Sequence, residues 1–247
     1  MSLNLKLLNS VWNIKVSGDK MIIESGLGYI AHKKVQELNK LREIKKNDPS
    51  YRIIDIGGGK EKHVLDKFDF IDATMDFRDV TAEHITHFSG NINDPYLWEK
   101  VDDDVKRNGR YDYCICTHTL EDIAYPAYVL KKINQISKAG IITFPSKYRE
   151  FKRFELNETI RGYSHHRWII TIKKQKLKFF PKVSIVENTV FDSIGKLSHP
   201  SIEEVFVVWK DGIDFEIFNN DWLGPSPVEF FKNFLNEITD TDENKML

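Results

Sequence analysis

The sequence predicts an α/β fold with a doubly wound, mostly parallel sheet. Short β-branched runs alternate with amphipathic helical runs over the first 146 residues, which is typical of repeated βαβ units. The first of these strands runs into Gly57-Gly58-Gly59, a tight connection between a strand and a helix. Parallel strands need crossover helices, and right-handed crossovers place such helices on both faces of a sheet.

The predicted elements follow one another in this order. A helix over 28–46 comes first, and Asn47-Asp48-Pro49 ends its apolar periodicity. Further helices are predicted at 60–68 and 124–137, between strands at 51–56, 70–75, 85–88, 111–117 and 140–144.

Beyond residue 146 the pattern changes to C-terminal β and helical additions. Two β-rich runs, 183–190 and 204–209, predict an antiparallel edge hairpin or meander. Ser226-Pro227-Val228-Glu229 has the cap residues of a terminal helix, and 239–247 is polar and acidic and is expected to fray. We expect one domain over 1–247, with a cofactor-binding core at about 50–146 and acceptor-side and C-terminal elements at about 147–238.

Composition excludes several classes of protein. The chain has 247 residues, of which 41% are hydrophobic and 30% charged, unlike a disordered chain or a membrane bundle. Its 36 basic and 37 acidic residues give a net charge of −1, which disfavours nucleic acid as a partner. Neither a secretory signal nor an apolar run of about 20 residues is found, so we expect a cytoplasmic protein without a membrane partner. Its oligomeric state is left open.

The two cysteines, Cys114 and Cys116, are predicted to be reduced core residues. Their spacing on a strand-like run does not close a sound disulfide, and two thiols lack the ligand count of a zinc site. We therefore assign no metal ligands.

The glycine turn carries the strongest chemical signal. Glycine lets the backbone approach a ligand that a Cβ would exclude, and the N-terminus of the next helix attracts a carboxylate or phosphate. A nucleotide-like cofactor fits this pattern. Lys62 occupies the third glycine position of the nicotinamide fingerprint, which weakens that reading.

With Asp55 just before the glycines, the chain resembles class I S-adenosylmethionine-dependent methyltransferases, in register across roughly 51–146. The resemblance implies that Asp76, seventeen residues after Gly59, binds the ribose, because a carboxylate can accept from two adjacent hydroxyls. It also implies that Asn91 bonds the adenine amine and that Ile92 lies against the ring. In all, it assigns to the S-adenosylmethionine site Asp55, Gly57, Gly58, Gly59, Asp76, Phe77, Asn91, Ile92, Thr117 and His118.

The exit of the fourth strand refines the resemblance. Leu120-Glu121-Asp122 looks like the Leu-Glu-His stretch of many small-molecule methyltransferases, with Asp122 in place of the histidine. The Asn/Asp-Pro-Pro-Tyr/Phe signature of many amino-methylating relatives is absent there, which favours a hydroxyl acceptor over nitrogen.

The segment 161–168 concentrates titratable and aromatic residues where this fold usually carries acceptor-binding elements. A histidine can take the proton of a hydroxyl acceptor near neutral pH. The alternative is a surface loop that leads into a buried segment at Trp168. The candidates are His165 or His166 as the catalytic base, Arg161 or Arg167 for an anionic group, and Tyr163 or Trp168 for stacking on a sugar or aromatic ring.

These observations predict an O-methyltransferase that acts on a small molecule, preferably the hydroxyl of a sugar, glycan or related metabolite. Two other hypotheses stay open. One is a catalytically inactive cofactor-binding module with a regulatory or partner role. The other is a nicotinamide oxidoreductase, which predicts NAD binding instead.

Overall fold

A computed structural model of the chain describes residues 16–17, 21–25, 29–58, 70–76, 85–156, 158–199, 202–218 and 227–246. The chain forms two compact units. The first, called here the sheet unit, comprises Ala31–Thr143 and Val208–Ile213. The second, called the C-terminal unit, comprises Met1–Ile30, Phe144–Val207 and Asp214–Leu247. A single folding domain can contain two such units, so the expected single domain stays a prediction.

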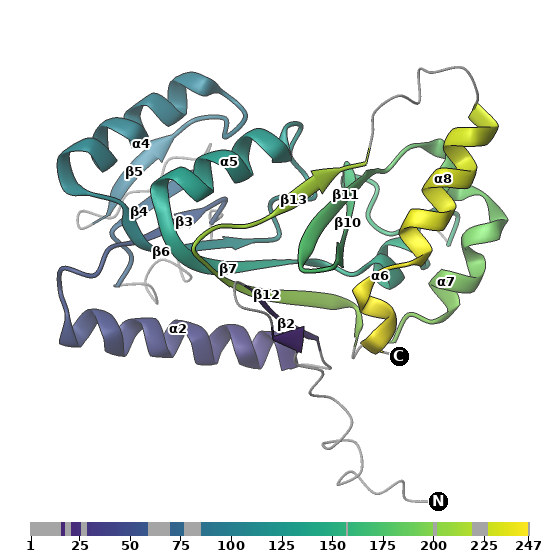
Figure 1. The fold of residues 1–247 in the computed structure, drawn as a ribbon, viewed down its shortest axis with the longest axis horizontal. Coiled ribbons are helices and arrows are strands. Elements are labelled where there is room, and N and C mark those ends of the chain that lie inside the picture. The colour runs from purple at the N-terminus through teal and green to yellow at the C-terminus, as the bar shows by residue number, and fades with distance from the viewer. Residues whose placement is uncertain are drawn as a thin grey trace, which may run out of the picture. The chain divides into compact units, whose positions relative to one another are not determined.

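The predicted parallel sheet is confirmed. Its central strands lie in the order β7-β6-β3-β4-β5, and each neighbouring pair is parallel. Figure 1 shows α4 and α5 on one side of these strands and α2 on the other, so helices cover both faces. The strands are β3 (Ile53–Ile56), β4 (Ala73–Asp76), β5 (Thr86–Ser89), β6 (Tyr111–Thr117) and β7 (Ser137–Pro145), and the helices are α2 (Tyr29–Asn47), α4 (Pro95–Asn108) and α5 (Pro126–Ile136). The helix predicted at 60–68 lies outside the described residues.

Local sequence explains where α4 begins and which face it buries. Asp94 accepts a hydrogen bond from the amide of Tyr96 (3.0 Å), and Pro95 occupies the first helical position. Leu97, Trp98 and Val101 recur at helical spacing and are buried. The helix therefore packs its apolar face on the unit's core.

The predicted strand at 183–190 is wrong. This segment forms two short 3-10 helices, η1 (Ser184–Glu187) and η2 (Thr189–Phe191). The Asn188 side chain accepts from the amide of Val190 (3.0 Å), and such local bonds compete with strand pairing. The hairpin expected between this segment and 204–209 is wrong for the same reason.

The strand predicted at 204–209 is present as β12 (Glu204–Lys210), and it lies beside β7 in the strand order. The amide of Ser146 donates to the carbonyl of Glu203, and that of Asp211 to Lys138 (both 2.9 Å). These two pairings run in opposite directions along the chain, so β12 is antiparallel to β7. The antiparallel C-terminal strand is therefore present, but its neighbour is β7 and not the segment 183–190.

The C-terminal unit contains a hairpin that the sequence did not predict. β10 (Trp168–Lys173) and β11 (Lys176–Pro181) pair antiparallel, and β13 (Phe215–Ile217) pairs parallel to β11. The turn residues Lys174 and Gln175 both have positive φ, 52° and 60°, as a two-residue hairpin of type I′ requires. Glycine or asparagine usually signals such a turn, and neither is present here.

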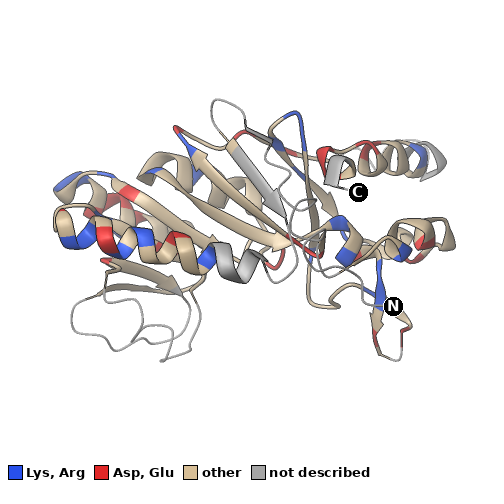
Figure 2. Cartoon of the chain, turned by 90° about the horizontal axis from the view of Figure 1, so that it is seen from below, with Lys and Arg blue, Asp and Glu red and all other residues tan. Residues whose placement is uncertain are grey.

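The remaining described elements are short except for the last helix. The terminal helix predicted after Ser226 is confirmed as α8. The elements are β1 (Val16–Ser17), β2 (Met21–Ser25), α6 (Lys147–Phe151), β8 (Arg153–Glu155), β9 (Ile160–Arg161), α7 (Asp192–Lys196), α8 (Pro227–Thr239) and the 3-10 helix η5 (Asp242–Met246). Acidic and basic residues are interspersed along the described helices (Figure 2). Among the described helices, none has the length and apolarity needed to cross a bilayer.

The end of the chain is held in place by a buried lysine, in contrast to the expected frayed tail. Lys147 Nζ donates to the carbonyl of Ile238 (3.2 Å), to Thr241 Oγ1 (2.6 Å) and to Asn244 Oδ1 (2.7 Å), which uses all three ammonium protons. Glu243 is fully buried and accepts from Thr171 Oγ1 (2.8 Å). Composition alone cannot reveal these contacts, because they join residues about 70 to 100 positions apart.

Replacing Gly140 by alanine should destabilise the sheet unit by about 1–3 kcal/mol, the usual cost of overpacking a core. A Cβ at position 140 would overlap the backbone carbonyl of Cys114 and the ring of Trp209. Urea unfolding followed by circular dichroism measures the change. Ala139→Ser, which adds one atom at the preceding, half-buried position, is the control and should change stability little. Equal effects of both variants would contradict this explanation.

Stability should also depend on pH through Glu243. Burial raises the pKa of its carboxyl to about 7, against the charge of Lys147 and the Thr171 hydrogen bond, which lower it. Because the folded-state value exceeds the unfolded one, the contribution to stability is complete below about pH 4.5 and is lost as the pH rises through 7. Its size is about 3 kcal/mol. Urea unfolding between pH 5 and 8 should show a flatter profile for Glu243→Gln than for the wild type, and parallel profiles would contradict the assignment.

Candidate active site

The glycine turn after β3 packs closely against its own protein. Gly57 has a φ of 78°, and its amide donates to the carbonyl of Met75 (2.8 Å). A Cβ at Gly57 would overlap the Thr119 side chain, and one at Gly58 would overlap the Asp55 carboxylate. Only glycine fits at both positions, for reasons of sterics and backbone conformation. The structure thus brings Asp55, Gly57 and Gly58 together, whereas Gly59 lies outside the described residues.

The adjacent strands end at the same edge of the sheet. Asp76 ends β4 opposite Ser89 of β5, and Asn91 follows two residues later. Asn91 Oδ1 accepts from the amide and the side chain of Asn93 (both 2.9 Å), which fixes the turn. Ile92 is buried, and its carbonyl accepts from Trp98 Nε1 (2.7 Å). Neither the side chain of Asp76 nor Phe77 belongs to the described part, so their roles stay predictions.

The exit of β6 adds two residues that the sequence did not indicate, Lys34 and Glu121. Lys34 Nζ donates to Thr117 Oγ1 (3.0 Å). His118 Nδ1 lies 3.2 Å from Glu121 Oε1, and Glu121 is only 1% exposed. Glu121 Oε2 has no hydrogen-bond partner among the described residues. The Leu-Glu-His resemblance could have drawn attention to Glu121, but only its last position was considered.

Backbone strain marks the same segment. His118 has a φ of 50°, in the left-handed region that non-glycine residues rarely adopt, and its amide donates to the carbonyl of Thr143 (3.0 Å). Strain of this kind persists where the surrounding structure enforces it, and it clusters at functional sites. The exit of β6 therefore combines a strained histidine with a buried acceptor.

The two cysteines, Cys114 and Cys116, lie in the core near Asp55. Both thiols are free and buried, as predicted. Burial raises the pKa of each thiol, and the nearby charge of Asp55 adds to the effect. They are core residues rather than nucleophiles.

In the C-terminal unit, two of the predicted acceptor-side residues belong to a buried polar cluster. His166 Nδ1 lies 2.7 Å from Glu150 Oε1, and Lys182 Nζ lies 2.7 Å from Glu150 Oε2. Lys182 also donates to the carbonyl of Tyr163 (2.6 Å). Gly162 has a φ of 57°, and a Cβ there would overlap the Glu150 carboxylate. The backbone at Gly162 therefore makes room for the pairing of Glu150 with Lys182.

Aromatic rings meet at the same place. The ring of Tyr163 lies 4.6 Å from that of His166 and 5.6 Å from that of His165, measured between centroids. Arg149 Nη2 donates to the Tyr163 hydroxyl (3.1 Å). His165 is exposed, whereas His166 is buried. The structure thus brings Tyr163, His165 and His166 together.

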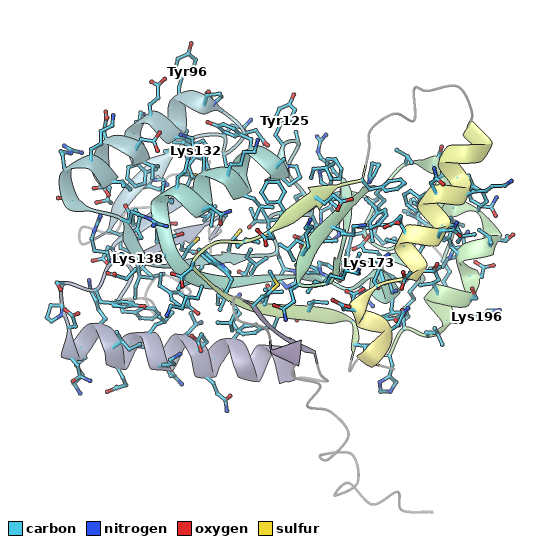
Figure 3. All side chains as sticks on the ribbon, in the orientation of Figure 1. Tyr96, Tyr125, Lys132, Lys138, Lys173 and Lys196 are labelled. Carbon is cyan, nitrogen blue, oxygen red and sulfur yellow. The ribbon has the colours of Figure 1, made fainter. Side chains whose placement is uncertain are left out.

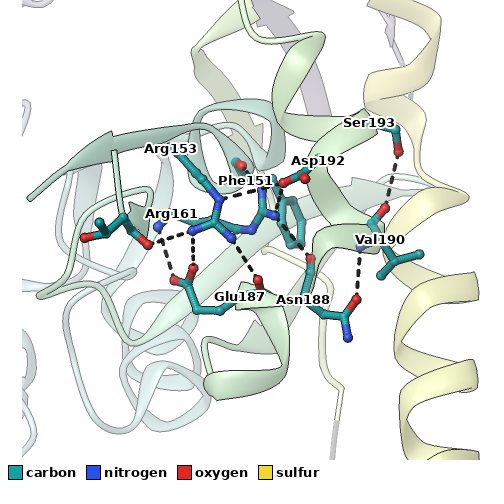
Figure 4. Close-up of polar contacts among 9 residues, drawn as sticks. Phe151, Arg153, Arg161, Glu187, Asn188, Val190, Asp192 and Ser193 are labelled. Carbon is teal, nitrogen blue, oxygen red and sulfur yellow. Dashed lines mark hydrogen bonds and ion pairs between the residues drawn. The ribbon is translucent and has the colours of Figure 1, made fainter. Parts of the chain in front are cut away.

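The other predicted acceptor-side residues are not part of this cluster. Arg161 is 1% exposed, donates to the carbonyl of Phe151 (2.7 Å) and pairs with Asp192 (Figure 4). These contacts join Arg161 to the end of α6 and the start of α7. Arg167 is exposed, and Trp168 packs edge-to-face on Phe179 at 6.3 Å. Roles for these three in acceptor binding stay predictions.

A family model described as a methyltransferase domain matches residues 28–177. The chain belongs to this methyltransferase family. The match covers the parallel sheet, the glycine turn and β10, and it confirms the resemblance and S-adenosylmethionine as the cofactor. No curated protein matches the chain.

The chain is also similar, at low identity, to several solved structures. The N-terminal domain of EvdMO1, crystallised with SAH and D-fucose, is 13% identical over 70% of this chain and 82% of its own, with a TM-score of 0.36. The methyltransferase domain of bacterial CtHen1 is 14% identical over 71% of this chain and 97% of its own (TM-score 0.35). A SAM-dependent methyltransferase from Archaeoglobus fulgidus is 10% identical over 69% of this chain and 92% of its own (TM-score 0.33).

The described residues of the sheet unit fit this cofactor. Its methionine end carries a carboxylate and two positive charges, on the ammonium and the sulfonium. The ammonium of Lys34 can pair with the carboxylate, and the buried Glu121 Oε2 is an acceptor that still needs a partner. The methyltransferase therefore offers groups of both signs at the exit of β6.

Gly58→Ala should weaken S-adenosylmethionine binding at least tenfold, which corresponds to about 1.4 kcal/mol. The added Cβ would displace the Asp55 carboxylate and with it the turn. Isothermal titration calorimetry gives the affinity, and thermal unfolding shows whether the variant is folded. A folded variant with wild-type affinity would show that the turn does not form the cofactor site.

Proposed function

We propose that this methyltransferase transfers a methyl group to a hydroxyl of a small molecule, preferably a sugar or related metabolite, with His166 as the general base. The contact between Glu150 and His166 carries the proposal. Glu150 accepts from Nδ1–H, which leaves Nε2 as the acceptor atom of the ring. A carboxylate in this position orients an imidazole and stabilises its charged form.

Lys182 holds the carboxylate that orients His166. Glu150 is 1% exposed, so its charge is stabilised by partners rather than by water. Lys182 binds one of its oxygens and His166 lies at the other, which leaves the carboxylate little freedom to turn. His166 therefore has a fixed ring orientation before any acceptor binds.

The proton transfer follows from this arrangement. S-adenosylmethionine, when bound, supplies a methyl group on a positively charged sulfur. The acceptor oxygen would take that methyl group, with the thioether as the leaving group, and His166 Nε2 would accept the proton that the acceptor hydroxyl loses. Base assistance of this kind contributes roughly 10²–10⁴-fold to a rate.

Aromatic side chains support the preference for a sugar. The ring of Tyr163 lies beside that of His166 at a tilt of 43°, and Arg149 donates a hydrogen bond to the Tyr163 hydroxyl. A tyrosine ring offers an apolar face and a polar edge, which suits the mixed surface of a sugar. We propose that Tyr163 contacts the acceptor, with Arg167 and Trp168 as further contacts.

His166→Gln and Glu150→Gln should each lower kcat about 10²–10⁴-fold, because both remove an oriented base. His165→Gln is the matched control, since its imidazole is exposed and adjacent in sequence, and it should keep activity within about threefold of wild type. The assay incubates enzyme and S-adenosylmethionine with free hexoses, deoxyhexoses and their nucleoside diphosphate forms. Mass spectrometry then detects the gain of one methyl.

Wild-type turnover in both His166→Gln and Glu150→Gln would rule out His166 as the base. Binding of the cofactor without methyl gain in any sugar would contradict the proposed acceptor class. The inactive cofactor-binding module would then be the better explanation.

A further inference from the structure

We propose that the Glu121 carboxylate binds the positive charge at the methionine end of S-adenosylmethionine. The inference rests on the cofactor of the proposed function and concerns a residue to which that function gives no role. It makes Glu121 a determinant of donor affinity rather than a catalytic base.

Burying the charged side chain of Glu121 costs free energy. Its side chain is 1% exposed, and an ionised carboxylate in that setting needs a compensating charge or several hydrogen bonds. Oε1 has His118 Nδ1 at 3.2 Å, and that imidazole is 41% exposed. Oε2 has no hydrogen-bond partner within the described chain. A cationic ligand at Oε2 would supply the partner that the described residues do not.

Glu121 also lies close in sequence to a residue that packs on the glycine turn. Glu121 comes two residues after Thr119, and the Thr119 side chain packs against Gly57 of the glycine turn. Thr119 Oγ1 also donates to the carbonyl of Thr117 (3.1 Å). The segment that carries Glu121 is therefore fixed against the turn that the family uses for its donor.

The charges of Lys34 and Glu121 are complementary to those of the cofactor. The methionine end of the cofactor has one negative and two positive groups. Lys34 reaches Thr117 Oγ1 on the same segment and offers a cation, while Glu121 offers an anion. Opposite charges in a partly dehydrated site attract each other far more strongly than in water. A zwitterionic ligand matches this pair better than a neutral one.

Three ligands separate the charges. S-adenosylmethionine carries both the sulfonium and the ammonium, S-adenosylhomocysteine only the ammonium, and 5′-methylthioadenosine neither. Calorimetry would measure the dissociation constant of each ligand for the wild type and for Glu121→Gln, which keeps the side-chain shape. Glu99→Gln, an exposed position on α4 of the same unit, is the matched control. Each titration is run both with and without EDTA.

We expect Glu121→Gln to weaken S-adenosylmethionine at least tenfold and to leave 5′-methylthioadenosine within twofold of wild type. Glu99→Gln should leave all three ligands unchanged. An equal loss for S-adenosylhomocysteine would assign the contact to the ammonium. A loss confined to S-adenosylmethionine would assign it to the sulfonium.

Three results would overturn the inference. The first concerns the dissociation constant of 5′-methylthioadenosine divided by that of S-adenosylmethionine, a ratio that does not depend on the folded fraction of the protein. The inference fails if this ratio is the same in Glu121→Gln as in the wild type. Another is a similar loss for all three ligands. The third is wild-type binding that EDTA itself weakens to the level of the variant, which would make a divalent cation the partner of Glu121.

Binding alone decides these outcomes, so they are independent of methyl transfer. The expected binding pattern without any methylated product would leave the role of Glu121 intact and contradict the proposed function. Methyl transfer to a sugar together with an unchanged ratio of dissociation constants would support the proposed function and contradict the role of Glu121.

Discussion

The close approach of β6 to the glycine turn is the constraint on which the candidate cofactor site depends. Thr119 and Asp55 fill the space that side chains at positions 57 and 58 would need. The turn after β3 can lie this close to the segment after β6 only because glycine has no Cβ and tolerates positive φ. The same contact fixes the chain just before Glu121. Geometry at the site therefore follows from packing between two strand ends rather than from any single binding residue.

In the C-terminal unit, buried charges play the equivalent organising role. Lys147 gives all three protons to the last residues of the chain, and Glu150 takes one partner at each oxygen. Removing one member of such a pair leaves an uncompensated charge, which costs more than the intact pair contributes. These groups thus specify which segments meet. Exposed side chains such as Tyr96 and Tyr125 of the sheet unit, which project outward in Figure 3, carry no such constraint.

Sequence periodicity was sufficient for the parallel sheet, because β3 and β6 are short apolar runs with turn residues at their ends. It was insufficient at 183–190, where Asn188 favours local hydrogen bonds, and at the turn Lys174-Gln175, which lacks the usual glycine. In the candidate site, the position of Asp55 just before the glycines indicated a cofactor-binding turn. Glu121 carried no such signal, since its burial and its unpartnered oxygen are consequences of tertiary packing.

The two histidine–carboxylate contacts differ in a way that separates their functions. Beside His166, both oxygens of the Glu150 carboxylate have partners, because Lys182 binds the second oxygen. Such a carboxylate can only orient its imidazole. At His118 the side chain is 41% exposed, and the second oxygen of Glu121 lacks a partner among the described residues. A buried carboxylate with an oxygen that lacks a partner is stabilised when a cation binds to it. A carboxylate whose two oxygens already have partners is not stabilised further. The same pair of residue types therefore suits a base in the C-terminal unit and a ligand contact in the sheet unit.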